Sequence, residues 1–401
     1  MLRRFLLVTL SIMFPTFVSA ADQVLSTTID GIETEIFIPG EHKLLRGVLV
    51  HSANYKLKPG DRWEEFCHQH AFAHVATNMT NVRTQGNRQP RLAKALHEGL
   101  KEFAAKSNHP ELVNLPFAGT GHSAGGLVTG VLLADPSRTI TNCVDCGWVM
   151  DPKKHGEEAG KVPALFTLGA VPDAFKMLPS IEQYYDPART AGLPWGLGLQ
   201  HGCAHDFGNS ATLMVAWIAG VAEQRLPKET PADGKMKLID IKQEAGWLGD
   251  RSTVDGNFAT IAPYADYKGD KAKATWFPNE AVATVWRAYQ SNKSPIMLTA
   301  VAGDRKLAEF TVKKSFDLMA DPELDITLGV KKDDELMPKK ISFYAADKLL
   351  GEANAEGKFV WKAPMRGQYQ VYAMWEMADG TRGVSNPALV TVRRKKAAVK
   401  E

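Results

Sequence analysis

The sequence lacks a phosphate-binding loop and a dinucleotide-binding fingerprint, so it implies no nucleotide or other cofactor. A strong excess of one charge is also missing, because 48 lysines and arginines face 45 aspartates and glutamates for a formal net charge of +3. So small a charge gives no reason to expect nucleic-acid binding, which depends on a strongly basic surface. No internal repeat or low-complexity tract appears, which excludes repeat architectures.

A membrane-spanning segment is missing as well. Residues 1–20 carry Arg3 and Arg4, a short apolar core from Phe5 to Phe14, and the small-residue ending Val18-Ser19-Ala20. This pattern predicts a signal peptide that is cleaved from the mature chain. The apolar core is too short to span a bilayer, so we expect no stable membrane insertion. We expect export to the periplasm or the extracellular medium, with the formal net charge falling from +3 to +1 as both arginines are lost.

Cysteine is scarce, with four in the chain: Cys67, Cys143, Cys146 and Cys203. An exported protein can oxidise its thiols, and four cysteines allow three pairings. We expect at least one disulfide, with Cys146 and Cys203 as one candidate pair. Cys143 and Cys146 have the spacing of half a zinc or redox site, but no second C-x-x-C follows. We therefore expect no metal site.

The mature chain, about 380 residues, is too long for one hydrophobic core, so we expect two domains. Strand-like and helix-like segments alternate up to about residue 227, which predicts an α/β domain with a mainly parallel sheet and helices on both faces. An irregular aromatic-rich stretch, residues 238–293, is expected to pack on this domain, giving it the bounds 21–293. Residues 294–395 show short alternating runs typical of a small all-β sandwich, and residues 396–401 a basic tail.

The most informative motif is G-x-S-x-G at residues 121–125, with Ser123 at its centre. Residues 115–120 before it predict a short strand, and residues 126–134 after it predict an apolar helix. In a strand–turn–helix setting the serine sits on a sharp turn, and small neighbours let strand and helix approach closely. The helix N-terminus adds positive potential where an oxyanion would form. The pattern predicts a nucleophilic serine, although a Gly-rich turn with an inert serine has the same pattern.

A serine nucleophile requires a base and an acid, expected in the chain order acid, then histidine. His205 follows the last predicted strand of the sheet and is favoured as the base over His201, which lies nearer that strand. Asp173 follows the strand before it and is favoured as the acid, although it could instead cap a helix. Asp151 is the reserve acid, and Asp145 is less favoured because it falls within a predicted strand.

Two backbone amides are expected to form an oxyanion hole. Ala124 supplies one, because it directly follows Ser123. The other is expected from the loop Ser52-Ala53-Asn54, with Ala53 favoured.

Taken together, these residues resemble the α/β-hydrolase superfamily over roughly residues 23–227. The segments 121–126 and 204–207 look like those of secreted serine esterases of the carbohydrate-esterase and polyester-depolymerase type, although Ser52 stands where many members have His-Gly. The segments 341–345, 348–351 and 367–392 resemble bacterial immunoglobulin-like domains. The fold class expected is α/β, an α/β-hydrolase followed by a small all-β sandwich.

The function expected is an exported serine hydrolase that cleaves carboxylic esters through an acyl-enzyme, with Ser123, His205 and Asp173 as its triad. Its partner would be an ester substrate, for which a polymeric or carbohydrate-linked ester is one option. Two alternatives stay open. The same machinery can cleave amides, which would make the protein an exported peptidase or amidase. A hydrolase domain that has lost its activity would instead leave a binding protein.

Overall fold

The computed structural model describes residues 21–51, 55–80, 86–147, 151–251, 258–291, 294–307, 316–362 and 364–393. The predicted signal peptide, the basic tail and the oxyanion candidate Ala53 lie outside these ranges. Within them, no helix is both long enough and apolar enough to cross a membrane.

The first half of the chain forms an eight-stranded sheet in the order β1-β2-β4-β3-β5-β6-β7-β8, in which β3 to β8 run parallel. Its strands are β1 (Gln23–Ile29), β2 (Ile32–Ile38), β3 (Gly47–His51), β4 (Phe72–Asn78), β5 (Phe117–His122), β6 (Thr139–Asp145), β7 (Ala164–Gly169) and β8 (Trp195–Gln200). β1 and β2 form the antiparallel hairpin at one edge. This strand order is that of the α/β-hydrolase fold, so the predicted fold class is confirmed.

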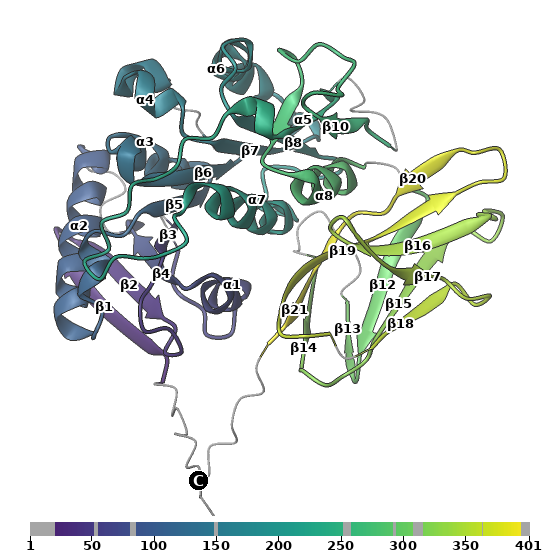
Figure 1. Ribbon diagram of the computed structural model, residues 1–401, viewed down its shortest axis with the longest axis horizontal. Coiled ribbons are helices and arrows are strands. Elements are labelled where there is room, and N and C mark those ends of the chain that lie inside the picture. The colour runs from purple at the N-terminus through teal and green to yellow at the C-terminus, as the bar shows by residue number, and fades with distance from the viewer. Residues whose placement is uncertain are drawn as a thin grey trace, which may run out of the picture.

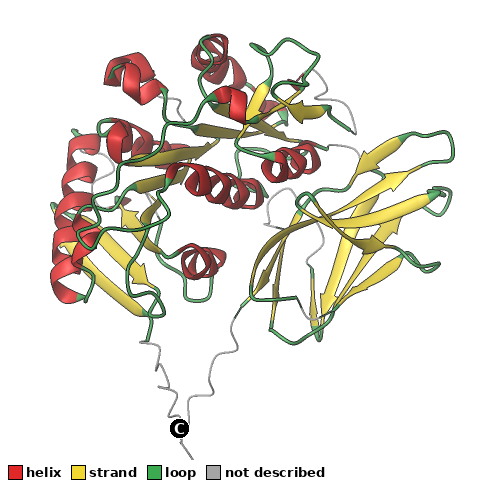
Figure 2. Ribbon diagram, viewed as in Figure 1, coloured by secondary structure: helices red, strands yellow, loops and turns green. Residues whose placement is uncertain are grey.

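Helices cover both faces of the sheet (Figures 1 and 2). They are α1 (Arg62–His70), α2 (Arg88–Lys106), α3 (Leu127–Leu133), α4 (Glu157–Gly160), α5 (Pro172–Phe175), α6 (Leu178–Thr190), α7 (Ser210–Arg225) and α8 (Glu280–Gln290). Successive side chains of a strand point to opposite faces of the sheet, so the sheet has one core on each face. β3 shows this. Val48 and Val50 join the core beneath α2 and α3, whereas Leu49 joins the core beneath α1 and α7. Parallel strands buried on both faces are continuously apolar for this reason.

Residues 238–291 contain more regular structure than the sequence predicted. They form a three-stranded antiparallel sheet of β10 (Ile261–Pro263), β9 (Trp247–Gly249) and β11 (Thr275–Phe277), and then α8. The Thr275 hydroxyl accepts a hydrogen bond from the Leu197 backbone N–H of β8 at 2.8 Å. The extension therefore covers the edge strand of the large sheet, which would otherwise present unpaired backbone groups.

The C-terminal part forms two sheets packed around one core, as predicted for a sandwich. One sheet has the order β13-β12-β15-β18, and the other has the order β14-β21-β19-β16-β17 with β20 paired to β19. The strands are β12 (Ile296–Ala302), β13 (Arg305–Lys306), β14 (Asp317–Ala320), β15 (Ile326–Lys332), β16 (Lys340–Ala345), β17 (Lys348–Glu352), β18 (Lys358–Trp361), β19 (Gly367–Glu376), β20 (Arg382–Val384) and β21 (Ala388–Val392). The sequence predicted strands at residues 296–301, 308–312, 324–328, 340–344, 358–362, 369–375 and 388–392, and so missed β13, β14, β17 and β20. The strand predicted at residues 308–312 lies outside the described residues.

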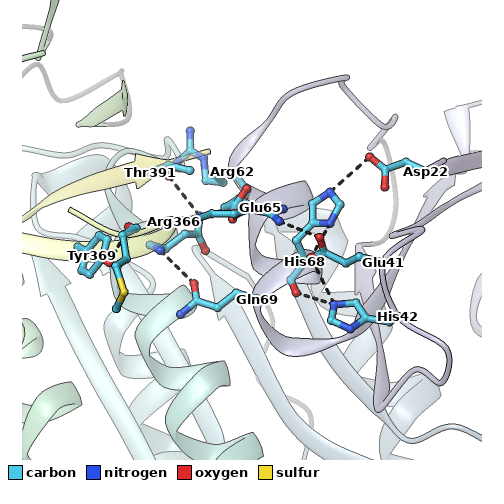
Figure 3. A network of polar contacts seen from close by, with 12 residues as sticks. Asp22, Glu41, His42, Arg62, Glu65, His68, Gln69, Arg366, Tyr369 and Thr391 are labelled. Carbon is cyan, nitrogen blue, oxygen red and sulfur yellow. Dashed lines mark hydrogen bonds and ion pairs between the residues drawn. The ribbon is translucent and has the colours of Figure 1, made fainter. Parts of the chain in front are cut away.

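The sandwich lies against the side of the α/β domain that carries α1, α7 and α8 (Figure 1). Arg366, just before β19, reaches α1 and the loop between β2 and β3, where its guanidinium pairs with Glu65 at 2.7 Å and with Glu41 at 2.8 Å (Figure 3). The Gln368 backbone N–H donates to the Gln69 side chain at 3.0 Å. Polar contacts thus fasten the two parts along α1.

The four cysteines are free, buried thiols, so the expected disulfide is not formed in this structure. Cys67 and Cys143 lie inside the core beneath α1 and α7. Cys146 and Cys203 lie near the same edge of the sheet, but each thiol donates to a backbone carbonyl, that of Ala204 at 3.8 Å and that of Asp206 at 3.4 Å. The loop backbone satisfies these thiols without a covalent bridge.

Candidate active site

Ser123 occupies a strained turn at the carboxyl end of β5. Its φ of 53° lies in the left-handed region, which costs free energy for a residue with a Cβ. A Cβ on Gly121 would lie 2.4 Å from the Gly125 carbonyl carbon, and one on Gly147 would lie 2.9 Å from the Ser123 carbonyl oxygen. Glycine is therefore required at both positions, because β5 and the residues after Ser123 touch backbone to backbone. The predicted strand–turn–helix setting is present.

The turn continues directly into a helix. The 3₁₀ helix η3 spans Ser123–Gly126, and α3 follows at Leu127. The amide of Ala124 therefore lies in the first turn, at the end where helical N–H groups lack intrahelical acceptors. This is the place that the sequence predicted for one oxyanion donor. Its predicted partner Ala53 falls outside the described residues.

His122 and Asp145 form a buried pair that the sequence did not predict. In the parallel register of β5 and β6 the two residues are direct neighbours, and Nδ1 of His122 lies 2.6 Å from Oδ2 of Asp145. Oδ1 of the same carboxylate accepts hydrogen bonds from the Thr167 and Ser210 hydroxyls, both at 2.8 Å. The Asp145 side chain is 1% exposed, against 31% for His122. A buried carboxylate thus has three donors, as the cost of burying its charge requires.

This finding corrects the prediction for Asp145. The sequence predicted a strand over residues 140–150 with Asp145 inside it, but β6 ends at Asp145. The position of Asp145 opposite His122 depends on the register between β5 and β6. The reserve acid Asp151 lies beyond this strand and is half-buried, as is His201, the competing base directly after β8.

The loop carrying His205 lies over the carboxyl ends of β5 and β7. The imidazole ring centroids of His205 and His122 are 5.1 Å apart in an edge-to-face arrangement, and His122 meets Phe207 at 6.1 Å. A Cβ on Gly169, the last residue of β7, would lie 2.2 Å from the Ala204 carbonyl oxygen. The loop thus packs directly on the sheet edge, and it places the exposed His205 beside the residue that precedes Ser123.

Asp173 lies in the first turn of α5, with 80% of its side chain exposed. Its carboxylate pairs with Lys176 at 2.9 Å. The hydrogen bond from Lys176 is the main reason that the pKa of Asp173 is lowered, and the nearby His205 lowers it further. Within the described part of the chain, no hydrogen bond joins His205 to Asp173 or to Ser123. The three predicted residues therefore come to one edge of the sheet, but their side chains are not linked in this structure.

One group of described residues could offer ligands to a metal ion, namely His122, Asp145 and Cys146, whose ligand atoms lie within 4.8 Å of one another. The short hydrogen bond between His122 and Asp145 already uses one nitrogen and one oxygen of the group. Burial raises the pKa of the Cys146 thiol to about 12, which disfavours the thiolate that binds metals. The group fits a hydrogen-bonded support for the Ser123 turn better than a metal centre.

Two buried histidines contact each other at the carboxyl end of β3. Nδ1 of His51 is 2.8 Å from Nε2 of His74, and Tyr55 stacks on His51 with ring centroids 4.3 Å apart. Burial lowers the pKa of His51 well below its ordinary range and that of His74 to about 4. Both imidazoles are therefore neutral at pH 7, so one can donate and the other accept.

A cleft of about 780 Å³ lies between α7, the end of α1 and the sandwich. Its walls carry polar side chains such as Arg46, Glu223 and Gln370, but neither Ser123 nor His205 is among them. At the edge of the sheet, Ser123 is half-buried and His205 is exposed.

No protein-family model matches the sequence, and no curated protein matches it. Among solved structures, a dienelactone hydrolase from Anabaena variabilis is 17% identical with a TM-score of 0.33, over 47% of this chain and 88% of that one. Est1E from Butyrivibrio proteoclasticus is 14% identical with a TM-score of 0.32, over 50% and 96%. Fibronectin(III)-like modules of Clostridium thermocellum CbhA are 19% identical with a TM-score of 0.19, over 23% and 94%. Because these values are low, the fold assignment rests on the strand order and register described above.

Proposed function

We propose that this protein is an exported serine hydrolase that cleaves carboxylic esters, with Ser123 as its nucleophile. The observation that carries the proposal is the strained backbone of Ser123, held at the end of β5 by glycines at which no side chain fits. Strain of this kind persists only where the surrounding structure imposes it, and it exposes a serine hydroxyl at the sheet edge.

The proposed reaction begins when His205 accepts the proton of the Ser123 hydroxyl and the serine oxygen attacks the acyl carbon. The Ala124 amide, with one from the loop at residues 52–54, would stabilise the oxyanion. His205 then gives its proton to the leaving alcohol, and water hydrolyses the acyl-enzyme by the same route. Asp173 is the proposed acid. Its carboxylate would have to turn from Lys176 to His205, a rearrangement that its exposure permits and that substrate-free sites often require.

The open site supports an extended substrate. Only the short helices η5 (Pro152–His155) and α4 (Glu157–Gly160) fill the segment between Asp151 and β7. No large insertion therefore covers Ser123 from that side, and a polymeric or carbohydrate-linked ester could approach. Export is proposed on the pattern of residues 1–20 alone.

The test is the hydrolysis of p-nitrophenyl esters of increasing acyl length and of peptide p-nitroanilides by the purified full-length protein. Ester cleavage that falls at least 10⁴-fold in Ser123→Ala, with an unchanged circular dichroism spectrum, is expected for a serine nucleophile. Ser137→Ala, at an exposed turn, serves as the matched control. Cleavage of anilides alone would favour the peptidase alternative. Ester turnover in Ser123→Ala at the wild-type rate would refute the assignment.

A further inference from the structure

The loop that carries His205 is closed by one buried side chain at each of its ends. Gln200 ends β8 before the loop, and Asn209 follows the loop directly before α7. The Asn209 backbone N–H donates to Oε1 of Gln200 at 2.9 Å, so the two ends are bonded to each other. Both side chains are buried, with 2% exposure each. The position of His205 therefore depends on how Asn209 is held.

The β-sandwich supplies the group that holds Asn209. Nδ2 of Asn209 donates to the backbone carbonyl oxygen of Pro387 at 2.6 Å, and Pro387 lies between β20 and β21. Oδ1 of the same carboxamide accepts from the Thr212 hydroxyl at 2.6 Å. Because both ends of the carboxamide are satisfied, its orientation is fixed. A residue of the C-terminal part thus completes the closure of the loop, although the two are 178 positions apart in the sequence.

Buried polar contacts lead from this clamp to the serine motif. The Tyr289 hydroxyl lies 3.4 Å from Oε1 of Gln200 and 2.9 Å from the Ser210 hydroxyl, and it can donate its one proton to either oxygen. Ser210 donates to Asp145, whose carboxylate binds His122 at 2.6 Å. Buried polar networks of this kind favour a single arrangement, because any broken link leaves an unsatisfied group in a medium of low dielectric constant.

We propose that Asn209 is a positioning residue through which the β-sandwich fixes the loop that carries His205. The sandwich is then a part of the catalytic architecture rather than an appended module. This inference rests on the proposed function of His205 as the base. A chain cut after residue 293 would lose the Pro387 carbonyl and with it the fixed loop.

Arg366, which also lies at the interface between the sandwich and the α/β domain, offers a control for Asn209. Arg366 fastens the sandwich to α1 through Glu65 and to the loop between β2 and β3 through Glu41 (Figure 3). Its side chain is 28% exposed and takes no part in the polar contacts that lead from Asn209 to His122. Arg366→Met removes these ion pairs and weakens docking along α1. A general effect of looser docking should therefore appear in Arg366→Met, whereas an effect on the loop should appear only at Asn209.

The experiment compares full-length Asn209→Asp, Asn209→Ser and Arg366→Met in the hydrolysis of a small soluble acyl ester. Asn209→Asp keeps the shape and the acceptor for Thr212 but faces the Pro387 carbonyl with a carboxylate oxygen. In Asn209→Ser the hydroxyl is too short to replace Nδ2. In both Asn209 variants we expect kcat to fall 10- to 100-fold with KM within threefold of wild type, because a misplaced base slows chemistry more than binding. Arg366→Met should keep the wild-type kcat.

Hydrogen exchange at residues 201–207 gives a readout that does not need activity. Exchange there should be faster in both Asn209 variants than in Arg366→Met, while β5 to β7 stay protected. A wild-type kcat in either Asn209 variant, an equal loss of kcat in Arg366→Met, or loss of the folded state in both Asn209 variants would overturn the proposal. If wild-type protein cleaves no ester, the proposed function fails, and the exchange comparison alone decides whether Pro387 fixes the loop.

Discussion

Two aspartates at the ends of neighbouring strands differ in burial and in hydrogen bonding, although both lie at the same edge of the sheet. Asp145 ends β6, is 1% exposed and accepts from His122, Thr167 and Ser210. Asp173 follows β7 in α5, is 80% exposed and pairs with Lys176. The buried carboxylate is fixed and holds other groups, whereas the exposed one is available to His205 at little cost to the fold. The contacts of Asp145 indicate a role in stability, whereas the proposed catalytic role falls to Asp173.

The largest effect is expected at the exposed aspartate. Asp173→Asn should lower kcat about a hundredfold or more, because a neutral amide cannot stabilise the imidazolium that forms on His205. The melting temperature should stay at the wild-type value, since exposed ion pairs contribute little to stability. Steady-state kinetics and a thermal melt of the same preparation check both parts.

Asp186→Asn is the matched control. Asp186 is an exposed aspartate in α6 that pairs with Arg251, away from Ser123. It should change neither kcat nor the melting temperature. Should Asp173→Asn turn over at the wild-type rate, Asp173 is not the acid of the proposed triad.

The opposite pattern is expected at the buried aspartate. Asp145→Asn should lower the free energy of unfolding by about 2 kcal/mol, because it replaces charge-assisted hydrogen bonds with neutral ones. Thr167→Val, which removes one neutral donor from the same carboxylate, should cost less than Asp145→Asn. Urea denaturation measures both. If the unfolding free energy of Asp145→Asn equals that of wild type, the hydrogen bonds of the Asp145 carboxylate do not stabilise the fold.

The buried pair of His51 and His74 defines the pH range in which the two aspartates can be compared. The pKa of His74 falls from its ordinary 6.5 to about 4 on burial, and that of His51 is also lowered. The unfolded chain therefore binds more protons than the folded one below pH 6.5. Stability is complete above that pH and is lost as the pH falls towards 4, with a slope of about 1.4 kcal/mol per pH unit for each histidine.

Urea denaturation between pH 7 and pH 4 checks this slope. His74→Gln should be less sensitive to acid than wild type by about one proton. An identical pH dependence in the two proteins would contradict the assignment of acid sensitivity to the buried pair.

The sequence predicted those features that depend on local pattern. The turn at residues 121–125 reflects contacts within a few residues of chain, and the succession of strand-like and helix-like segments reflects local pattern. Both the turn and the mainly parallel sheet are as expected. The pairing of His122 with Asp145 depends on the register between β5 and β6, which no short stretch of sequence specifies. The contact between Asn209 and Pro387 depends on how the sandwich docks on the α/β domain, and it joins residues 178 positions apart in the sequence. The disulfide expectation was wrong because proximity in a fold does not decide which atom a buried thiol contacts.

The central claim is that Ser123 is an activated nucleophile at the end of β5. Labelling of the full-length protein with a fluorophosphonate, followed by peptide mass mapping, tests it most directly, because the reagent forms a covalent bond only with a serine that a base activates. The account predicts one adduct, on the peptide that contains Ser123, and slower labelling in Asn209→Asp. The absence of an adduct, or an adduct confined to another serine, would contradict it.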